Sequence, residues 1–89
     1  MLYLPNAFTP NGDGKNDFFV IHAIFVNTFK IKIFNRIGNM VFQSEDYKTF
    51  WDGTKNGTPV PSDSYFYEII ATDFKGETTK KSGGITVLR

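Results

Sequence analysis

The sequence contains no cysteine, which excludes both a disulfide framework and a thiolate metal site. It also lacks any run of about 18 apolar residues, so no segment is expected to cross a membrane as a helix. Its ten basic and nine acidic residues are mixed along the chain, and the densest basic stretch is the pair Lys80 and Lys81. No nucleic-acid partner is therefore expected.

The residues that most enzymes require are equally scarce. The single histidine, His22, ends an apolar segment and has no cysteine to activate. The carboxylate pairs Asp13 with Asp17 and Glu45 with Asp46 fall in polar loops without a pocket-forming context. No phosphate-binding glycine loop is present, because the glycines that begin at Gly12 have the wrong spacing. We predict a recognition domain rather than an enzyme.

What the chain has in abundance is aromatic side chains. Ten Phe, four Tyr and one Trp make up 17% of the 89 residues. A chain of this length has room for one domain, spanning residues 1–89, and it must bury large apolar groups to be stable. Each aromatic ring buries roughly 150–250 Å². A core held by apolar packing alone is therefore expected.

Apolar residues alternate with polar ones, or form short runs between turn residues, and no helical period is found. In residues 29–33, Phe29, Ile31 and Ile33 share one face. Gly83 and Gly84 are expected to break the last strand in two. About seven short strands result, at residues 2–4, 18–21, 29–34, 40–42, 65–71, 77–81 and 85–88. This pattern predicts an all-β antiparallel sandwich.

The loop at residues 9–17 concentrates turn residues and oxygen ligands. Gly12 and Gly14 favour positive φ, which folds the backbone back sharply. Calcium prefers six to eight oxygens on such a loop, and the side chains that could supply them are Asn11, Asp13, Asn16 and Asp17. The spacing does not fit an EF-hand. A loop whose side chains cap its own amides is the alternative, and the sequence leaves both open.

A second cluster comprises Tyr47, Phe50 and Trp51 beside the turn formed by Asp52 and Gly53. Aromatic rings next to a polar turn could form a platform for sugars. Core packing of Trp51 is the favoured interpretation, because a small sandwich needs a large central residue.

Several motifs together resemble one known family. Residues 4–17 read LPNAFTPNGDGKND, and the match continues in the same order through residues 33–36, Gly38, 41–42, 51–53, Gly57, 59–61, 65–67 and 84–89. This series resembles the gliding-motility-associated C-terminal domain family, which comprises the type B C-terminal sorting domains of the type IX secretion system. Two positions depart from the family pattern. Asp63 and Ser64 stand where Gly-Thr is common, and Ile37 stands where an aromatic residue is common.

The resemblance implies an immunoglobulin-like β-sandwich at the end of a large, adhesin-like passenger protein of a Gram-negative bacterium. The domain would direct that passenger through the periplasm and across the outer membrane to the cell surface or medium. Its expected partners are the type IX machinery and an outer-membrane accessory protein, without direct membrane insertion, and it is expected to be a monomer. Arg89 fits the family's native end, so Met1 is interpreted as an added start of a fragment.

A folded signal must be recognised as a surface, through sheet edges or exposed loops. The candidates are the loop at 11–17, the hairpin turn after residue 34 and the terminal strand at 85–89. Their residues are Asn11, Gly12, Asp13, Gly14, Asn16, Asp17, Asn35, Arg36, Gly38 and Arg89. The alternatives to a sorting signal are a calcium-stabilised carbohydrate-binding or adhesion module and a structural spacer.

Overall fold

The computed structural model describes residues 2–10, 12 and 17–89, which form nine β-strands and no helix. Four strands are long enough to build a sheet: β4 (Thr28–Phe34), β5 (Met40–Ser44), β8 (Asp63–Thr72) and β9 (Thr78–Val87). Five strands have two residues each: β1 (Leu2–Tyr3), β2 (Ala7–Phe8), β3 (His22–Ala23), β6 (Thr54–Lys55) and β7 (Thr58–Pro59).

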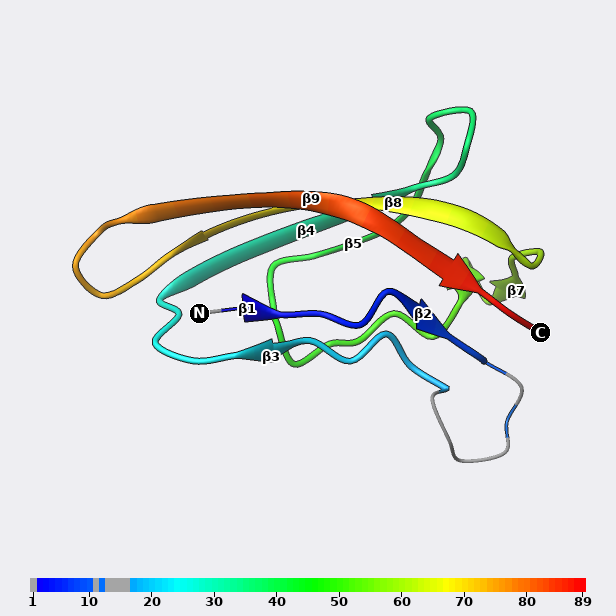
Figure 1. Cartoon of the computed structure of the whole chain (residues 1–89), viewed down its shortest axis with the longest axis horizontal. Coiled ribbons are helices and arrows are strands. Elements are labelled where there is room, and N and C mark those ends of the chain that lie inside the picture. Colours follow the sequence, from blue (N-terminus) through cyan, green and yellow to red (C-terminus); the bar gives the residue numbers. More distant parts are fainter. Residues whose placement is uncertain (1, 11, 13–16) are drawn as a thin grey trace.

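The main sheet has five strands in the order β2-β9-β8-β4-β5. Strand β8 lies at its centre and pairs antiparallel with β9 along ten residue pairs and with β4 along seven. Strand β2 is the exception, because it runs parallel to the end of β9. In Figure 1 strands β4, β5, β8 and β9 of this sheet form the upper layer, β2 lies below the end of β9, and the long β8–β9 hairpin runs the full length of the molecule.

The lower layer consists of shorter pairings. Strand β1 pairs with β3, and Phe19 forms an isolated antiparallel bridge with Trp51. The N-terminal segment contributes to both layers, since β1 pairs in the lower layer and β2 joins the main sheet (Figure 1). The structure thus confirms the all-β, immunoglobulin-like sandwich.

Alternation explains how the main sheet closes the core. The inward side chains of β8 are Tyr65, Tyr67, Ile69 and Ala71, all buried, as the period-two pattern predicts. Phe29, Ile31 and Ile33 of β4 face the same side, as expected. From the lower layer, Phe8, Phe19 and Trp51 complete the core. Burying each of the larger side chains among these is worth roughly 1.5–3 kcal/mol or more, and the core contains no disulfide.

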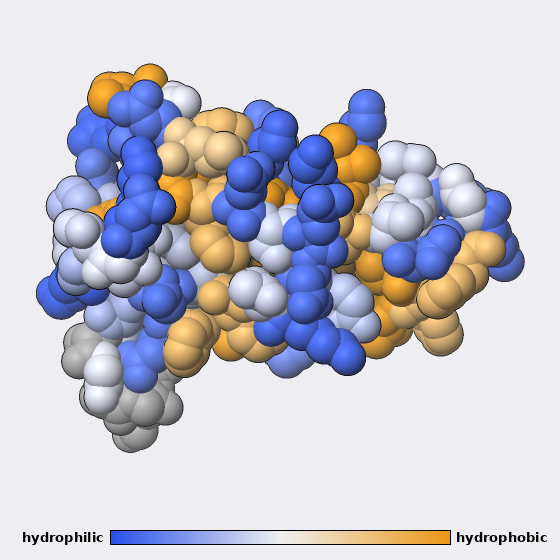
Figure 2. Space-filling view, turned by 180° about the vertical axis from the view of Figure 1, so that it is seen from behind, coloured by the Kyte–Doolittle hydropathy of each residue, from blue (hydrophilic) through white to orange (hydrophobic). Residues whose placement is uncertain are grey.

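The outer surface mixes polar and apolar side chains. Figure 2 shows the side of the molecule opposite to Figure 1, where bands of hydrophilic side chains run between hydrophobic ones. Exposed apolar residues such as Phe66 and Ile70 therefore have polar neighbours on the sheet, among them Glu68. A surface of this kind suits a protein in water.

Two strand predictions were wrong. Gly83 and Gly84 do not interrupt the last strand, because β9 pairs with β8 without a break from Thr78 to Val87. A Cβ at Gly83 would lie 2.8 Å from the Tyr67 hydroxyl oxygen, so the glycine makes room for that ring. Residues 18–21 do not form a strand in a sheet. Phe19 and Ile21 are buried, but only Phe19 pairs, through its bridge to Trp51.

Candidate recognition surface

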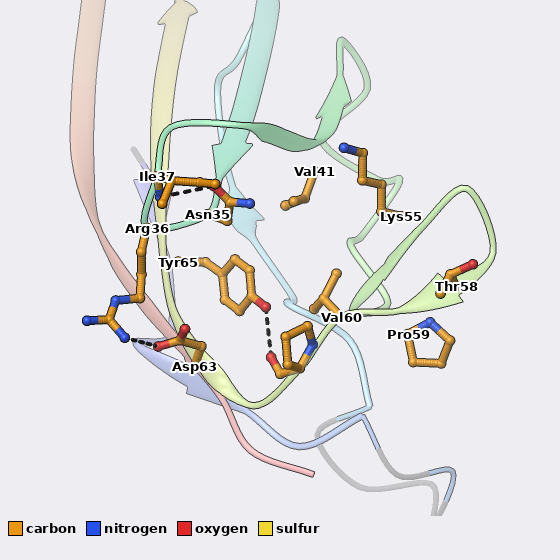
Figure 3. A pocket seen from close by; sticks show the side chains of 11 residues that line it. Asn35, Arg36, Ile37, Val41, Lys55, Thr58, Pro59, Val60, Asp63 and Tyr65 are labelled. Atoms are coloured by element: carbon orange, nitrogen blue, oxygen red, sulfur yellow. Dashed lines mark hydrogen bonds and ion pairs between the residues drawn. The ribbon is translucent and has the colours of Figure 1, made fainter.

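Two of the predicted recognition residues, Asn35 and Arg36, lie at a groove at one end of the sandwich. There the turn between β4 and β5, the β6–β7 hairpin and the segment leading into β8 surround a groove of about 730 Å³ (Figure 3). Its buried side chains are Val41, Val60 and Tyr65. Its exposed lining includes Arg36 and Ile37. The groove therefore has an apolar base and a mixed rim.

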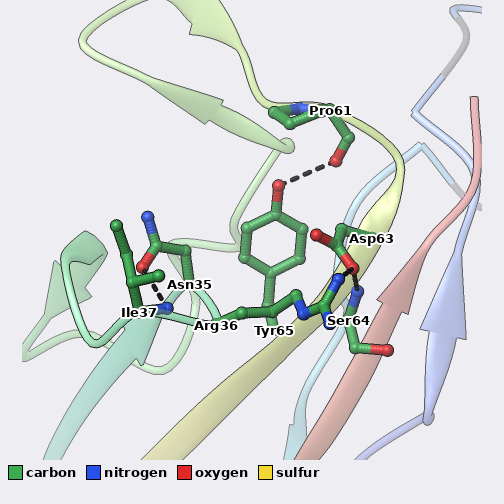
Figure 4. Close-up of polar contacts among 7 residues, drawn as sticks. All are labelled: Asn35, Arg36, Ile37, Pro61, Asp63, Ser64 and Tyr65. Atoms are coloured by element: carbon green, nitrogen blue, oxygen red, sulfur yellow. Dashed lines mark hydrogen bonds and ion pairs between the residues drawn. The ribbon is translucent and has the colours of Figure 1, made fainter.

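Asn35 shapes the turn beside this groove. Its side-chain Oδ1 accepts a hydrogen bond from the backbone N–H of Ile37 at 3.1 Å (Figure 4) and another from that of Asn39 at 2.9 Å. Gly38, at φ +91°, donates its N–H to the Asn35 carbonyl oxygen at 3.1 Å. This is the behaviour expected of Asn and Gly in a tight turn. The Asn35 side chain and carbonyl oxygen and the Gly38 N–H thus form hydrogen bonds within the turn and stabilise its shape.

Arg36 and Ile37 are the residues that the turn presents outward. The Arg36 guanidinium lies 3.5 Å from the Asp63 carboxylate at the start of β8 (Figure 4). Both members of this pair are substantially exposed, so it adds little stability. Ile37 is 82% exposed. Sequence analysis noted Ile37 only as a departure from the family pattern, yet it is the most exposed apolar side chain of the turn.

Tyr65 closes the base of the groove. Its hydroxyl donates a hydrogen bond of 2.7 Å to the Pro61 carbonyl oxygen (Figure 4). Burial raises the pKa of Tyr65 above its ordinary value, with Asp63 raising it further and Arg89 opposing the change. The phenol therefore stays protonated at neutral pH and keeps this bond. Tyr65 was predicted only as a strand residue, and its place in the groove depends on tertiary packing.

Arg89 forms hydrogen bonds with several separate segments of the domain. Its guanidinium donates to the carbonyl oxygens of Pro10, Gly53 and Val60, and its backbone N–H donates to Ser62 Oγ at 2.9 Å. Gly53 permits this approach, since a Cβ there would lie 2.8 Å from Pro10 Cγ and 3.1 Å from Arg89 Nη2. One side chain thus joins three separate segments.

The glycine-rich loop is described only in part. Gly12 has φ +80°, as predicted, and its N–H donates to Asp17 Oδ1 at 3.0 Å. The other loop candidates, Asn11, Asp13, Gly14 and Asn16, lie outside the described residues. The cation site predicted there remains a prediction.

Trp51 packs in the core, as sequence analysis favoured. Its side chain is 1% exposed, with its ring centroid 5.4 Å from those of Phe8 and Tyr65. Its indole N–H donates to the Thr54 carbonyl oxygen at 3.0 Å. A ring held in this way offers no free face on which a sugar could stack.

The described part of the chain brings together no group of three or more His, Cys, Asp and Glu side chains that could hold a metal ion. Among the same residues, no helix has the length and apolar character needed to span a bilayer. The described residues form a small β-sandwich with a groove at one end.

The sequence matches the model of the CHU_C type IX secretion signal domain over residues 2–87, and the chain belongs to this family. No curated protein gave a significant match to it. The family is one of secretion signals and not of enzymes. Membership implies an interaction with the type IX secretion machinery and export toward the cell surface or extracellular space.

Proposed function

We propose that this domain directs a large cell-surface or secreted passenger protein, of the adhesin type, across the outer membrane through the type IX system. The observation that carries the proposal is the family match over residues 2–87, nearly the whole chain. The compact sandwich supports it, because a signal in the form of a folded domain must be recognised through its surface.

The end groove is a candidate for side-chain recognition. Its apolar base and exposed rim resemble the general anatomy of a binding site, in which an apolar centre is bordered by polar groups. Arg36 and Ile37 are available at this rim, while Asn35 and Gly38 keep them in place. The proposal therefore assigns partner contact to Arg36 and Ile37 and a shaping role to Asn35 and Gly38.

A reporter fusion tests the sorting function. A periplasmically targeted fluorescent protein that carries this domain at its C-terminus should reach the medium or cell surface of a type IX-competent strain. The same reporter without the domain should stay in the periplasm, and so should the complete fusion in a strain that lacks the translocon. Fractionation with immunoblotting measures the distribution. Retention of the intact, folded fusion in the competent strain would contradict the proposal.

A calcium ion in the N-terminal loop is proposed on the basis of its oxygen-rich sequence, with Asn11, Asp13, Asn16 and Asp17 as ligands. At calcium concentrations about 100-fold above the dissociation constant, binding should raise the melting temperature by roughly 10–20 °C. Replacing Asp13 and Asp17 with alanine should abolish that increase. Thermal unfolding followed by circular dichroism in EDTA, magnesium and calcium measures it. Identical melting of the unmodified domain in all three buffers would rule the site out.

A further inference from the structure

Strand β9 has a long free edge. One side of it pairs with β8 over its whole length, from Thr78 to Val87. The other side pairs only with the two residues of β2, at Thr86 and Val87. On that side, no strand of the described residues pairs with the stretch from Thr78 to Gly84, which covers about 20 Å at the usual rise of a strand. In Figure 1 β9 lies at the front of the sheet, with this side uncovered along most of its length.

The hydrogen bonds to β2 identify the backbone groups that face this edge. Thr86 donates its N–H to the Asn6 carbonyl oxygen at 2.8 Å, and Leu88 donates to the Phe8 carbonyl oxygen at 3.0 Å. Successive residues of a strand direct their backbone groups to opposite sides, and the register with β8 is unbroken. The N–H and C=O groups of Lys80, Ser82 and Gly84 therefore point away from β8.

The free backbone groups of β9 lie outside the terminal segment that the sequence suggested. Sequence analysis proposed the terminal strand at 85–89 as a recognition element. Thr86 and Leu88 already donate to the segment of β2, and Arg89 holds three carbonyl groups of the domain. The free backbone groups lie earlier in β9, where the glycines had been expected to end the strand.

Two grooves border parts of this edge. On the outer face a groove of about 470 Å³ lies at the end of the free stretch, lined by Gly84, Phe66 and the segment of β2. On the inner face a groove of about 350 Å³ lies between Lys81 and the apolar Phe25 and Val26. The side chains of an added strand alternate between the two faces, so an inward side chain near Lys81 and an outward one near Gly84 would each meet a groove.

The charge at this edge is positive. Lys80 and Lys81 are exposed, and neither forms an ion pair within the described residues. Opposite residues 78–84, β8 carries one acidic side chain, Glu68, which is also the register partner of Lys32 in β4. The turn before β9 carries Asp73, Lys75 and Glu77, and Asp73 lines the inner groove together with Lys81. The charge of the lysine pair (+2) exceeds that of this turn (−1), so an added strand would meet a net positive charge.

We propose that residues 78–84 of β9 receive, by strand addition, an extended acidic segment of a component of the type IX machinery. The inference rests on the proposed sorting function and names the kind of partner segment. Lysines at an edge discourage pairing between copies, because two β9 edges side by side would bring four lysines together. An Asp- or Glu-bearing strand would instead gain both ladder hydrogen bonds and charge complementarity.

The test uses the reporter fusion with two kinds of edge variant. Lys80→Glu with Lys81→Glu reverses the charge and leaves the backbone intact. Lys80→Pro with Ser82→Pro removes two outward N–H groups that β8 does not use, a change that edge strands tolerate. Export of either variant should fall by about tenfold or more. The matched control is Lys30→Glu with Lys48→Glu, which changes net charge equally and should be exported normally. Lys30 lies in β4, separated from β9 by Ile70 of β8, and Lys48 lies in the segment after β5.

Circular dichroism and the melting temperature of the purified chain check that each variant folds. If the proline variant does not fold, the charge variant alone tests the proposal. Export of the folded charge variant at the unmodified level overturns the inference while leaving the sorting function in place. Retention of the unmodified fusion overturns both. A dimer in analytical ultracentrifugation that the edge variants abolish would assign the edge to a second copy and also overturn the proposal.

Discussion

Replacing Trp51 with alanine is expected to lower the free energy of unfolding by about 3–5 kcal/mol. The side chain contacts both layers, with Phe8 and Tyr65 against its ring and Thr54 accepting its N–H. A cavity at this position cannot be filled by neighbours that the two layers hold in place. Domains of this size have a total stability of roughly 5–15 kcal/mol, so the variant would be close to unfolding. Urea unfolding followed by circular dichroism measures the change.

Two further variants test whether the loss of stability is specific to the buried Trp51 ring. Trp51→Phe keeps much of the apolar contact but loses the indole hydrogen bond, and a smaller loss of about 1–2 kcal/mol is expected. Phe74→Ala removes an aromatic ring that is 73% exposed, and it should change stability by less than about 0.5 kcal/mol. A Trp51→Ala variant as stable as the Phe74→Ala variant would mean that the two layers do not close over this ring.

The parts of the fold that could be predicted from the sequence are those governed by period-two alternation. Residues 29–33 and 65–71 each place alternate apolar side chains on one face, and both form central strands of the main sheet. Alternation indicates burial but not the partner strand. Residues 18–21 show the difference, because Phe19 and Ile21 are buried as predicted but lie outside any sheet.

The β9 strand was misinterpreted for a different reason. Glycine weakens a strand on average, so Gly83 and Gly84 indicated a break. In the folded domain the Tyr67 ring packs against Gly83, and the ladder with β8 continues through both glycines. A cross-strand contact between residues 16 positions apart cannot be recognised without the register. The same register places the free edge at residues 78–84.

The recognition candidates fall into two groups: residues whose polar groups are bonded within the domain, and residues whose side chains are exposed. Asn35 and Gly38 form the turn, while Arg36 and Ile37 are presented by it. Sequence patterns mark all such positions alike, since turn-forming and partner-binding residues are both polar or glycine in exposed loops. Arg89 is the clearest case, because its partners are backbone carbonyl oxygens, which no sequence motif reveals.

Replacing Arg89 with alanine is expected to lower the free energy of unfolding by about 2–3 kcal/mol. The guanidinium joins the N-terminal loop at Pro10, the turn at Gly53 and the segment at Val60. Three planar N–H donors are needed to reach three segments at once, so Arg89→Lys should recover only a minor part of the loss. Guanidinium unfolding of the 89-residue chain measures stability. Amide hydrogen exchange at Val60, which donates to the Gly53 carbonyl oxygen at 2.9 Å, should report local loosening.

Arg36→Ala is the matched control, because Arg36 has the same charge and makes one exposed ion pair at 3.5 Å. It should change stability by less than about 0.5 kcal/mol. The two arginine variants are therefore expected to affect export of the reporter fusion in different ways. Arg36→Ala should reduce export of a fully stable domain, whereas Arg89→Ala should reduce export only under conditions in which the domain unfolds. If Arg89→Ala leaves stability and Val60 exchange unchanged yet blocks export, then Arg89 is a contact for the machinery and its carbonyl bonds are dispensable.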